Sequence, residues 1–344
     1  MKKEKKEEGK VRVIIMMVMM MVMMGCNSGG VKDPEKVFLS DIANLGKGFM
    51  DVFVSFGDMV TGTLGIKAET KKEDIGKYFS DIEKSMQTTK VKLNEILEKN
   101  GQYEKVRKVV EEFISGIVDK IAAGAKEAAK GATGDDKIGG ATQAGQDANA
   151  ADRVAVNSLV KGIKGIVGVV LKENEGDATV TKTNGDQQKT IGKLFAAKAN
   201  GGEEVHAAAA NASIVVVSGV DMLQAISKSD EVVGEVEIEK AKNAADIAAA
   251  KQENDKGIKD AAKKDAVIAG GIALRGMAKG GKFAAKDEEK SANAVNGAVA
   301  SAVNKVLSTL VIAIRNTVDK GLKEISEVLG EIKQGEGVEA KVSK

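Results

Sequence analysis

The stretch that decides the fold is VASAVNKVLSTLVIAIRNTVDKGLKEISEVLGEI, at residues 299–332. Its apolar side chains recur at steps of three and four residues, the spacing that places them on one face of an α-helix. No proline interrupts the region from Asp287 to Lys333. The pattern predicts one long helix whose apolar stripe must be covered by other helices. The stripe comprises Val299, Val303, Leu307, Leu310, Ile314, Val318, Leu322, Ile325, Leu329 and Ile332.

Three further helices with the same spacing are predicted in the first third of the chain. The first begins at Asp33, a good N-cap, and Pro34, which suits the first helical position. The second begins at Thr70 to Glu73, which matches a capping box, and ends at Asn100-Gly101. The three apolar faces are, in order, Phe38, Ile42, Leu45, Phe49, Val52, Phe56 and Met59; Ile75, Phe79, Ile82, Met86, Leu93 and Ile96; and Tyr103, Val106, Val110, Phe113, Ile117 and Ile121.

The start of the chain has the pattern of a lipoprotein signal. Six cations in residues 2–12 precede an apolar run at 13–24, and Gly25 stands before Cys26, the only cysteine. The run is shorter than the roughly 20 residues of a membrane-spanning helix and fits a signal peptide. We expect cleavage between Gly25 and Cys26 and an N-palmitoyl, S-diacylglyceryl Cys26, although Met23 stands where leucine is commonest. The alternative is a cleaved signal beside an ordinary buried thiol.

These features predict the domain organisation. We expect a signal peptide at 1–25, a lipidated tether at 26–33, a single helical domain at 34–333 and a polar tail at 334–344. The first and last helices are expected to lie side by side and, because the tether is short, to form a membrane-proximal stalk. The predicted fold class is therefore all-α, an elongated helical bundle with paired terminal helices and a loop-rich distal face.

Charge and cysteine content limit the partners. The signal segment removes six cations and three anions from totals of 52 and 50, which leaves a formal charge of −1. This balance gives no case for general polybasic binding to nucleic acid or anionic lipid. With Cys26 lipidated, no thiol remains for a disulfide or a thiolate metal site, so stability must come from a buried core. The oligomeric state stays open.

Polar, glycine-rich stretches in the middle of the chain predict surface loops. The longest are Gly131 to Ala150 and Glu173 to Lys189, and shorter ones lie at Lys228 to Glu235 and Gln252 to Gly257.

Compact helices are predicted between these loops. One is centred on Leu159, Ile163, Ile166 and Val170, a second runs from Glu203 to Ser227, and a third, rich in alanine, runs from Val236 to Lys251. Ile214 to Val217 would suit a strand by β-branching alone, but the alanines before it and the apolar residues after it favour a buried helix.

Signatures of catalysis and metal binding are weak. The single histidine, His206, follows two glutamates and resembles half of a zinc-ligand pair, but no second histidine stands four residues on. A histidine on a helix surface is the preferred interpretation. Nucleophilic catalysis would have to use His206 or the lipidated Cys26. We therefore expect no catalytic, cofactor or metal site.

Two glycine patterns resemble nucleotide sites only in part. Gly276 to Phe283 has the glycine spacing and lysine of a phosphate loop, but Phe283 replaces the Ser/Thr that would hold magnesium, so a helix end with Gly280 at the cap is favoured. Gly162, Gly165 and Gly168 are expected to form a small-residue packing face. The acidic pairs Glu111-Glu112 and Asp135-Asp136 are expected on solvated faces.

A longer segment resembles a known family. The stretch KKDAVIAGGIALRGMAKGGKF, at 263–283, closely resembles the invariant helical segment of the variable large proteins of relapsing-fever spirochaetes and of their relative VlsE, the variable surface lipoprotein of Lyme spirochaetes. The resemblance extends to the signal with Cys26, to FLSDIANLGKGF at 38–49 and to VLSTLVIAIRNTVD at 306–319. It implies an abundant outer-surface lipoprotein, expressed one version at a time, whose replacement defeats antibody. It also implies a helical body on the lipid with variable loops facing away from the cell.

The leading hypothesis is therefore an immune-evasion antigen without a catalytic site. Its expected partners are outer-membrane lipid, through the acyl chains of Cys26, and host antibodies. The alternative is an adhesin or complement-binding receptor whose loops or alanine-rich helices bind a host protein. An enzyme or transport lipoprotein would need a pocket with convergent polar groups, which only the fold could reveal.

Overall fold

The computed structural model describes residues 36–37, 40, 43–44, 65–99 and 104–335, and the regular elements within these ranges are helices with isolated β-bridges between them. The elements are α3 (Lys72–Lys99), α4 (Glu104–Phe113), the π-helical η1 (Ile114–Val118), α5 (Asp119–Gly131), α6 (Arg153–Val170), α7 (Gly185–Thr190), the 3₁₀-helical η2 (Ile191–Phe195), α8 (Glu204–Val216), α9 (Gly219–Ser227), the 3₁₀-helical η3 (Ile238–Lys240), α10 (Ala244–Ala249), α11 (Asp265–Met277) and α12 (Glu289–Gly335).

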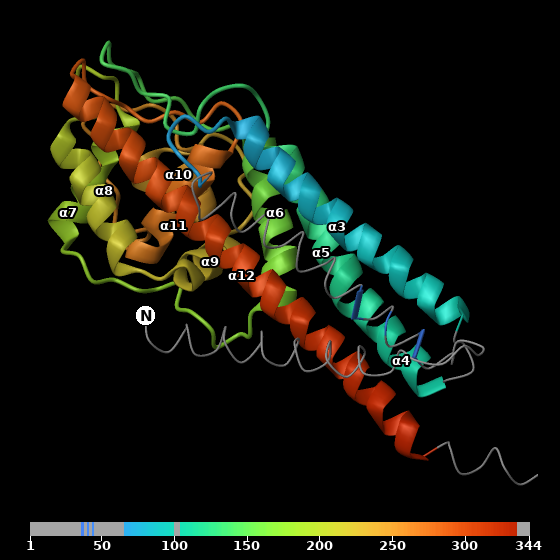
Figure 1. Cartoon of the computed structure of the whole chain (residues 1–344). Coiled ribbons are helices and arrows are strands. Elements are labelled where there is room, and N and C mark those ends of the chain that lie inside the picture. The colour runs from blue at the N-terminus through green and yellow to red at the C-terminus, as the bar shows by residue number, and fades with distance from the viewer. Residues whose placement is uncertain (1–35, 38–39, 41–42, 45–64, 100–103, 336–344) are drawn as a thin grey trace, which may run out of the picture.

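The described helices form an elongated body with a narrow arm and a broad end (Figure 1). The arm contains α3, α4, α5 and the C-terminal part of α12, and the broad end contains α7 to α11 and the first part of α12 (Figure 1). α6 packs against α5 on one side and against α9 on the other, so it joins the two parts. The predicted all-α bundle is confirmed.

The long C-terminal helix is confirmed as α12. Eight residues of its predicted stripe, from Val299 to Ile325, are buried. The stripe packs on α8, α9 and α11 in the broad end and on α4 in the arm. α12 is long and apolar enough to cross a membrane by composition, but half of its apolar window is buried inside the protein. Its hydrophobicity is therefore explained in large part by helix packing.

α3 begins later than predicted and is capped differently. The helix starts at Lys72, and the hydroxyl of Thr70 accepts a hydrogen bond from the Lys67 amide at 3.0 Å, outside the helix. Asp74 accepts from the Lys71 amide at 3.0 Å, and the amides of Lys72 and Glu73 donate to backbone carbonyls of residues 136 and 134. The predicted capping box is wrong because these backbone partners replace the Thr70 hydroxyl.

The third predicted helix contains a π-helical turn. α4, η1 and α5 follow one another without interruption from Glu104 to Gly131. A π-turn adds one residue to the helical repeat, so the buried face advances by one position. Phe113, Ile114 and Val118 are buried, whereas Ile117, which was predicted to face inward, is only half-buried.

Of the three predicted packing glycines, Gly162 makes the closest contact with another helix. A Cβ on Gly162 of α6 would lie 2.4 Å from the Ala128 amide nitrogen and 2.5 Å from the Gly124 carbonyl oxygen of α5. A Cβ on Gly165 would lie 3.7 Å from Gly124, and one on Gly168 would meet no atom within 4 Å. The small-residue face is therefore correct at Gly162 and wrong at Gly168.

The predicted helix from Glu203 to Ser227 is two helices, α8 and α9, which meet at 98°. Ser218 begins α9 by accepting a hydrogen bond from the Asp221 amide at 3.1 Å. A Cβ on Gly219 would lie 1.9 Å from the Thr309 hydroxyl of α12, so the bend brings the start of α9 against α12. Ile214 to Val216 are helical, as predicted.

The alanine-rich stretch from Val236 to Lys251 does not form one continuous helix, contrary to prediction. Only η3 and the six-residue α10 form within it. The carbonyl oxygens of Ala248 and Ala250 accept hydrogen bonds from Arg275, and the Lys251 amide donates to the Val236 carbonyl. These long-range bonds replace the helical ones.

The first predicted helix, with its face from Phe38 to Met59, lies largely outside the described residues, as do the signal segment and Cys26. Its pairing with α12 stays a prediction.

Candidate functional site: a buried helix and the surface segments at its two ends

α11 is the most enclosed helix of the broad end. All 13 of its residues are buried, and it packs against α8, α9, α10 and α12 (Figure 1). Glycines allow these contacts: a Cβ on Gly271 would lie 2.6 Å from Ile247 of α10, and one on Gly276 would lie 2.7 Å from Val299 of α12. The helix within the segment that carries the family resemblance is therefore enclosed by the rest of the fold.

A buried carboxylate, Asp265, begins α11. It is 0% exposed and accepts hydrogen bonds from the Ser213 hydroxyl at 2.7 Å and the Gln188 amide group at 3.1 Å. The backbone amides of Lys182 and Thr183 donate to it at 2.6 and 2.8 Å, and the Thr183 hydroxyl donates at 2.5 Å. Burial raises the pKa of Asp265, but these hydrogen bonds outweigh burial and hold the pKa below its usual range.

A buried ammonium, Lys72 of α3, lies at the other end of α11. Its Nζ is within 3.2 Å of four backbone carbonyl oxygens, those of Arg275, Gly276, Ala278 and Gly281. Burial lowers the pKa of Lys72 below its usual value, with Asp136 opposing the shift and Arg275 and Lys282 adding to it. The four carbonyl oxygens favour the charged form and act against this lowering.

Arg275, near the end of α11, is the second buried cation. Its guanidinium donates to the carbonyls of Lys282, Ala248 and Ala250 at 2.7–3.1 Å. Its Cζ lies 4.7 Å from the centre of the Phe195 ring and 5.4 Å from that of Phe283, within the range of cation–π attraction. Burial lowers its pKa to about 9, so it stays charged at neutral pH. Arg275 thus ties three segments of the broad end together.

The C-terminal end of α11 holds the segment Gly131 to Ala150. Gln146 and Ala285 exchange two backbone hydrogen bonds at 2.8 Å, and Asn149 and Lys282 exchange two at 3.0 and 2.9 Å. Ile138, Ala141 and Ala148 of this segment are buried. Only part of the predicted surface loop is therefore free surface, principally the exposed residues 133–135 and 142–144.

The N-terminal end of α11 holds the segment Glu173 to Lys189. Besides the bonds to Asp265, the Asp177 amide donates to Asp221 of α9 at 2.7 Å, and Gln224 of α9 donates to the Glu175 carbonyl at 2.8 Å. Residues 172–177 are nevertheless exposed. The two long polar segments thus lie at opposite ends of α11, about 18 Å apart for a helix of this length.

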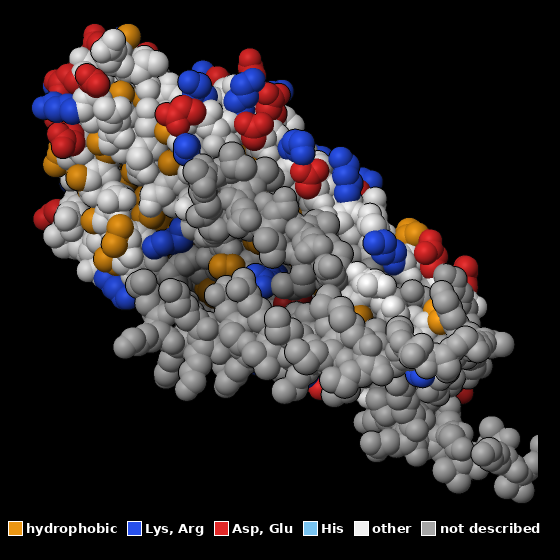
Figure 2. All heavy atoms as spheres, viewed as in Figure 1, with side chains coloured by type: hydrophobic (Ala, Val, Ile, Leu, Met, Phe, Trp, Pro, Cys, Tyr) orange, Lys and Arg blue, Asp and Glu red, His pale blue; other side chains and the backbone are white. Residues whose placement is uncertain are grey.

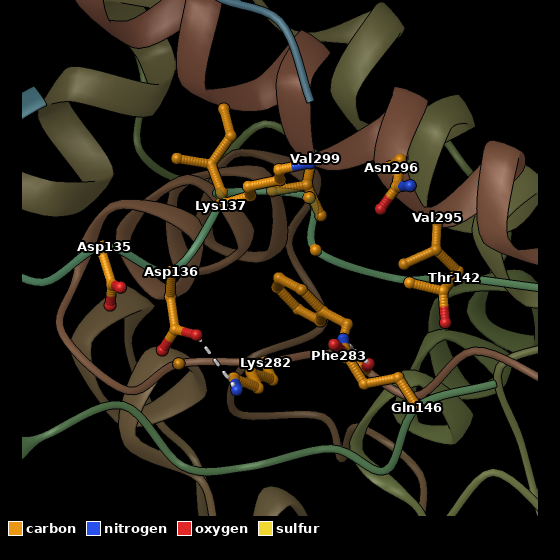
Figure 3. Close-up of a pocket in the computed structure, with 14 residues that line it drawn as sticks. Asp135, Asp136, Lys137, Thr142, Gln146, Lys282, Phe283, Val295, Asn296 and Val299 are labelled. Carbon is orange, nitrogen blue, oxygen red and sulfur yellow. Dashed lines mark hydrogen bonds and ion pairs between the residues drawn. The ribbon is translucent and has the colours of Figure 1, made fainter. Parts of the chain in front are cut away.

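A cleft of about 300 Å³ opens between the first segment and α12 (Figure 3). Phe283 lies in the middle of it, with Val295, Asn296 and Val299 on the α12 side (Figure 3). Its polar side chains contact neighbouring protein groups: Asp136 pairs with Lys282 at 3.2 Å, and Gln146 donates to the Phe283 carbonyl at 2.8 Å. Asn296 accepts from the amide of Ala141 and donates to its carbonyl. These contacts fix the surface segment to Lys282 and Phe283 and, through Asn296, to α12.

The described surface carries charges of both signs. Lys and Arg alternate with Asp and Glu along α3 and over the upper end of the molecule (Figure 2). Ion pairs such as Lys77 with Asp81 connect them. Of the predicted acidic pairs, Glu111 and Glu112 are exposed, whereas Asp136 is half-buried beside Lys282.

The motifs to which the sequence assigned no functional role can be located in the structure. His206 is half-buried in the first turn of α8, where its Nδ1 accepts from the Glu203 amide at 3.0 Å; burial lowers its pKa. No cluster of three or more potential metal ligands occurs in the part of the chain that the structure describes. The helix expected to end at Gly280 ends earlier, at Met277, because the chain turns there around Lys72. Gly280 itself has a φ of +78°.

Lys72, Asp265 and Arg275 were not singled out by the sequence. Arg275 carried a usable signal, since a lone charge inside an apolar helix has to find buried polar partners. Lys72 and Asp265 carried none, because each stands among other charged residues at a helix start.

Comparison of the sequence with known proteins agrees with this architecture. A family model described as Borrelia lipoprotein matches residues 49–329. Variable large protein 4 of Borrelia hermsii is 60% identical over 321 residues, which cover 90% of each chain. Variable large protein 17 of the same organism is 58% identical over 298 residues, covering 84% of this chain and 83% of that protein.

A solved structure of a related protein has a similar fold. The crystal structure of the Lyme disease variable surface antigen VlsE of Borrelia burgdorferi matches with a TM-score of 0.68 and 33% identity, covering 84% of this chain and 97% of that chain. The chain thus shares the all-helical fold of that surface antigen. The chain belongs to the Borrelia lipoprotein family and is similar to the variable large proteins within it. The resemblance found in the sequence is confirmed.

Proposed function

We propose that the protein is a lipid-anchored outer-surface antigen that acts in antigenic variation and evasion of host antibody, without catalytic activity. The observation that carries the proposal is the separation of a closed helical frame from exposed polar segments, in a chain of this family. α11 is buried along its whole length, while residues 142–144 and 172–177 are exposed.

This separation allows variation at little energetic cost. Substitutions on an exposed surface change stability by about 0.5 kcal/mol or less, whereas truncations in a core cost about 2–5 kcal/mol. Versions that differ at the exposed residues would keep the same frame. An antibody against one version contacts those residues and loses them in the next.

The attachment to the membrane is part of the same proposal. The Gly25-Cys26 pair after a cationic, apolar leader supports cleavage before Cys26 and its modification by palmitoyl and diacylglyceryl groups. The lipoprotein description of the family supports it as well. The acyl chains would hold the protein on the outer membrane, with the helical body facing the host.

Protease treatment of intact cells, combined with mapping of version-specific antibody sites, tests the proposal. We expect protease to cleave the protein on intact cells, and substitutions at 142–144 and 172–177 to remove most antibody binding. Cells permeabilised before treatment are the control for protease sensitivity. Protection on intact cells would contradict the location. Unchanged antibody binding, together with saturable binding of a host protein, would favour an adhesin instead.

A further inference from the structure

We infer that the backbone at the end of α11 forms a binding site for a compact monovalent cation, and that the ammonium of Lys72 occupies this site from α3. The inference concerns the four carbonyl oxygens of Arg275, Gly276, Ala278 and Gly281, here called the carbonyl nest. It is independent of the proposed function.

The geometry is that of a coordinated ion. The Nζ of Lys72 lies 3.2, 2.9, 2.7 and 2.9 Å from the four oxygens, and the Lys72 residue is 0% exposed. An ammonium has only three protons, so four oxygens at these distances surround it as ligands do. Gly281 makes the turn possible, because a Cβ there would lie 2.3 Å from the Arg275 carbonyl oxygen.

The nest attracts a cation through carbonyl dipoles. Its oxygens belong to the last turn of α11 and the residues after it, where helix carbonyls lack intrahelical partners and carry partial negative charge. The carboxylate that acts on the pKa of Lys72, Asp136, is ion-paired with Lys282 at 3.2 Å. Arg275 and Lys282 act against a charge in the nest, so the carbonyls have to offset both.

This donor set indicates the class of ion. Carbonyl rings replace the hydration shell of K⁺ in channel filters, whereas Ca²⁺ and Mg²⁺ sites normally include carboxylates. We therefore assign the nest to ammonium, primary alkylammonium ions and K⁺. Occupation by Lys72 joins the first residue of α3 to the end of α11, so docking of the arm depends on a cation in the nest.

Removal of the side chain tests the site directly. Lys72→Ala deletes the atoms of n-propylammonium, so this ion should refill the nest. We expect the variant to melt at least about 5 °C below the parent, and n-propylammonium chloride to restore most of that loss. Tetramethylammonium chloride at the same ionic strength, which is too large for the nest, should not restore it. Lys77→Ala, an exposed lysine on the same helix, is the matched control and should show no difference between the two salts.

Lys72→Met provides a second variant, because it keeps the aliphatic stem and removes the charge. We expect it to be destabilised and not rescued by n-propylammonium, whose position the stem fills. A Lys72→Met protein as stable as the parent would overturn the inference. Equal rescue of Lys72→Ala by both salts, or by neither, would overturn it too.

A measurement on the parent covers the case in which neither variant folds. In ¹⁵N-lysine-labelled protein at pH 8, a slowly exchanging ammonium signal from Lys72 should be visible, because the carbonyls retain the proton. Loss of that proton near pH 7 would mean that desolvation outweighs the carbonyls, and the nest would then not be a cation site.

Discussion

The ring of Phe113 on α4 lies directly against Gly321 of α12. A Cβ placed on Gly321 would stand 2.2 Å from Cε2 of the ring, and Phe113 is only 5% exposed. Val318 and Leu322, which flank Gly321, are also buried. Any side chain at position 321 would therefore push α4 away from α12. The packing of these two helices in the arm thus requires glycine at this position.

Gly321→Ala is expected to destabilise the protein by about 1–3 kcal/mol through overpacking. Thermal unfolding followed by circular dichroism measures the change. Gly297→Ala on the same helix is the matched control, because a Cβ there meets no atom within 4 Å. The control should stabilise α12 by about 0.5–1 kcal/mol through helix propensity. Similar effects of the two substitutions would rule out the close contact.

Leu310→Asp should unfold the protein or lower its stability by about 3–5 kcal/mol, since Leu310 is 1% exposed and the new charge would be buried without a partner. Chemical denaturation measures the loss. Ile312→Asp, at a position 54% exposed two residues away, should change stability little. Phe49→Asp, outside the described residues, tests the expected pairing of the first helix: a variant as stable as the parent would speak against that pairing.

Asp265→Asn should cost about 3 kcal/mol or more at pH 7, because charged hydrogen bonds contribute about 1.5–3 kcal/mol each and the amide cannot accept from all five donors. The folded-state pKa of Asp265 lies below its ordinary 3.8. Its stabilisation is therefore complete above pH 3.8 and is lost as the pH falls through the folded pKa. Urea unfolding at several pH values should show the parent and the variant converging in acid. Asp260→Asn, with a side chain 98% exposed, is the control. A pH-independent gap would contradict the assignment.

Replacement of the exposed residues Thr142 to Ala144 by unrelated polar residues should leave helicity and melting temperature nearly unchanged and reduce binding of version-specific serum. Gly145→Val, one residue further on, should destabilise the protein: Gly145 has a φ of +75°, and a Cβ there would lie 2.8 Å from Lys198 and 3.0 Å from the Asp287 amide. If both changes were equally tolerated, the segment would be a free loop.

Cys26→Ala should abolish acyl labelling and release the protein from the membrane fraction. Metabolic labelling with palmitate followed by membrane fractionation measures both effects, and Cys26→Ser is a second, nearly isosteric variant. A labelled, membrane-bound product after either substitution would show that the lipid is carried elsewhere.

Periodic apolar residues made the longest helices predictable from the sequence. The stripe from Val299 to Ile325 and the face from Ile75 to Leu93 are buried as predicted, because spacing alone decides which side of a long helix faces the core. The family resemblance at 263–283 then marked the segment that contains α11, all of whose residues are buried.

Predictions from local sequence failed where residues distant in the sequence form hydrogen bonds with the backbone or pack against it. The alanine-rich stretch has the propensity for a helix, yet Arg275 binds the carbonyls of Ala248 and Ala250 and the helix stops at Ala249. The π-turn at Ile114–Val118 buries Val118 in place of Ile117, which a repeat of 3.6 residues does not predict. The site at the ends of α11 was hidden for the same reason, since its partners come from α3, α8 and the segment before α7.

The contact between Lys72 and the carbonyls of α11 joins residues 203 to 209 positions apart. Bringing them together closes a very long loop, and the entropy of loop closure grows only with the logarithm of length. Ten residues added to or removed from the exposed segments in between would change that entropy by less than about 0.1 kcal/mol. The frame therefore tolerates differences in length as readily as differences in sequence, so related chains whose exposed segments differ in length can share one fold.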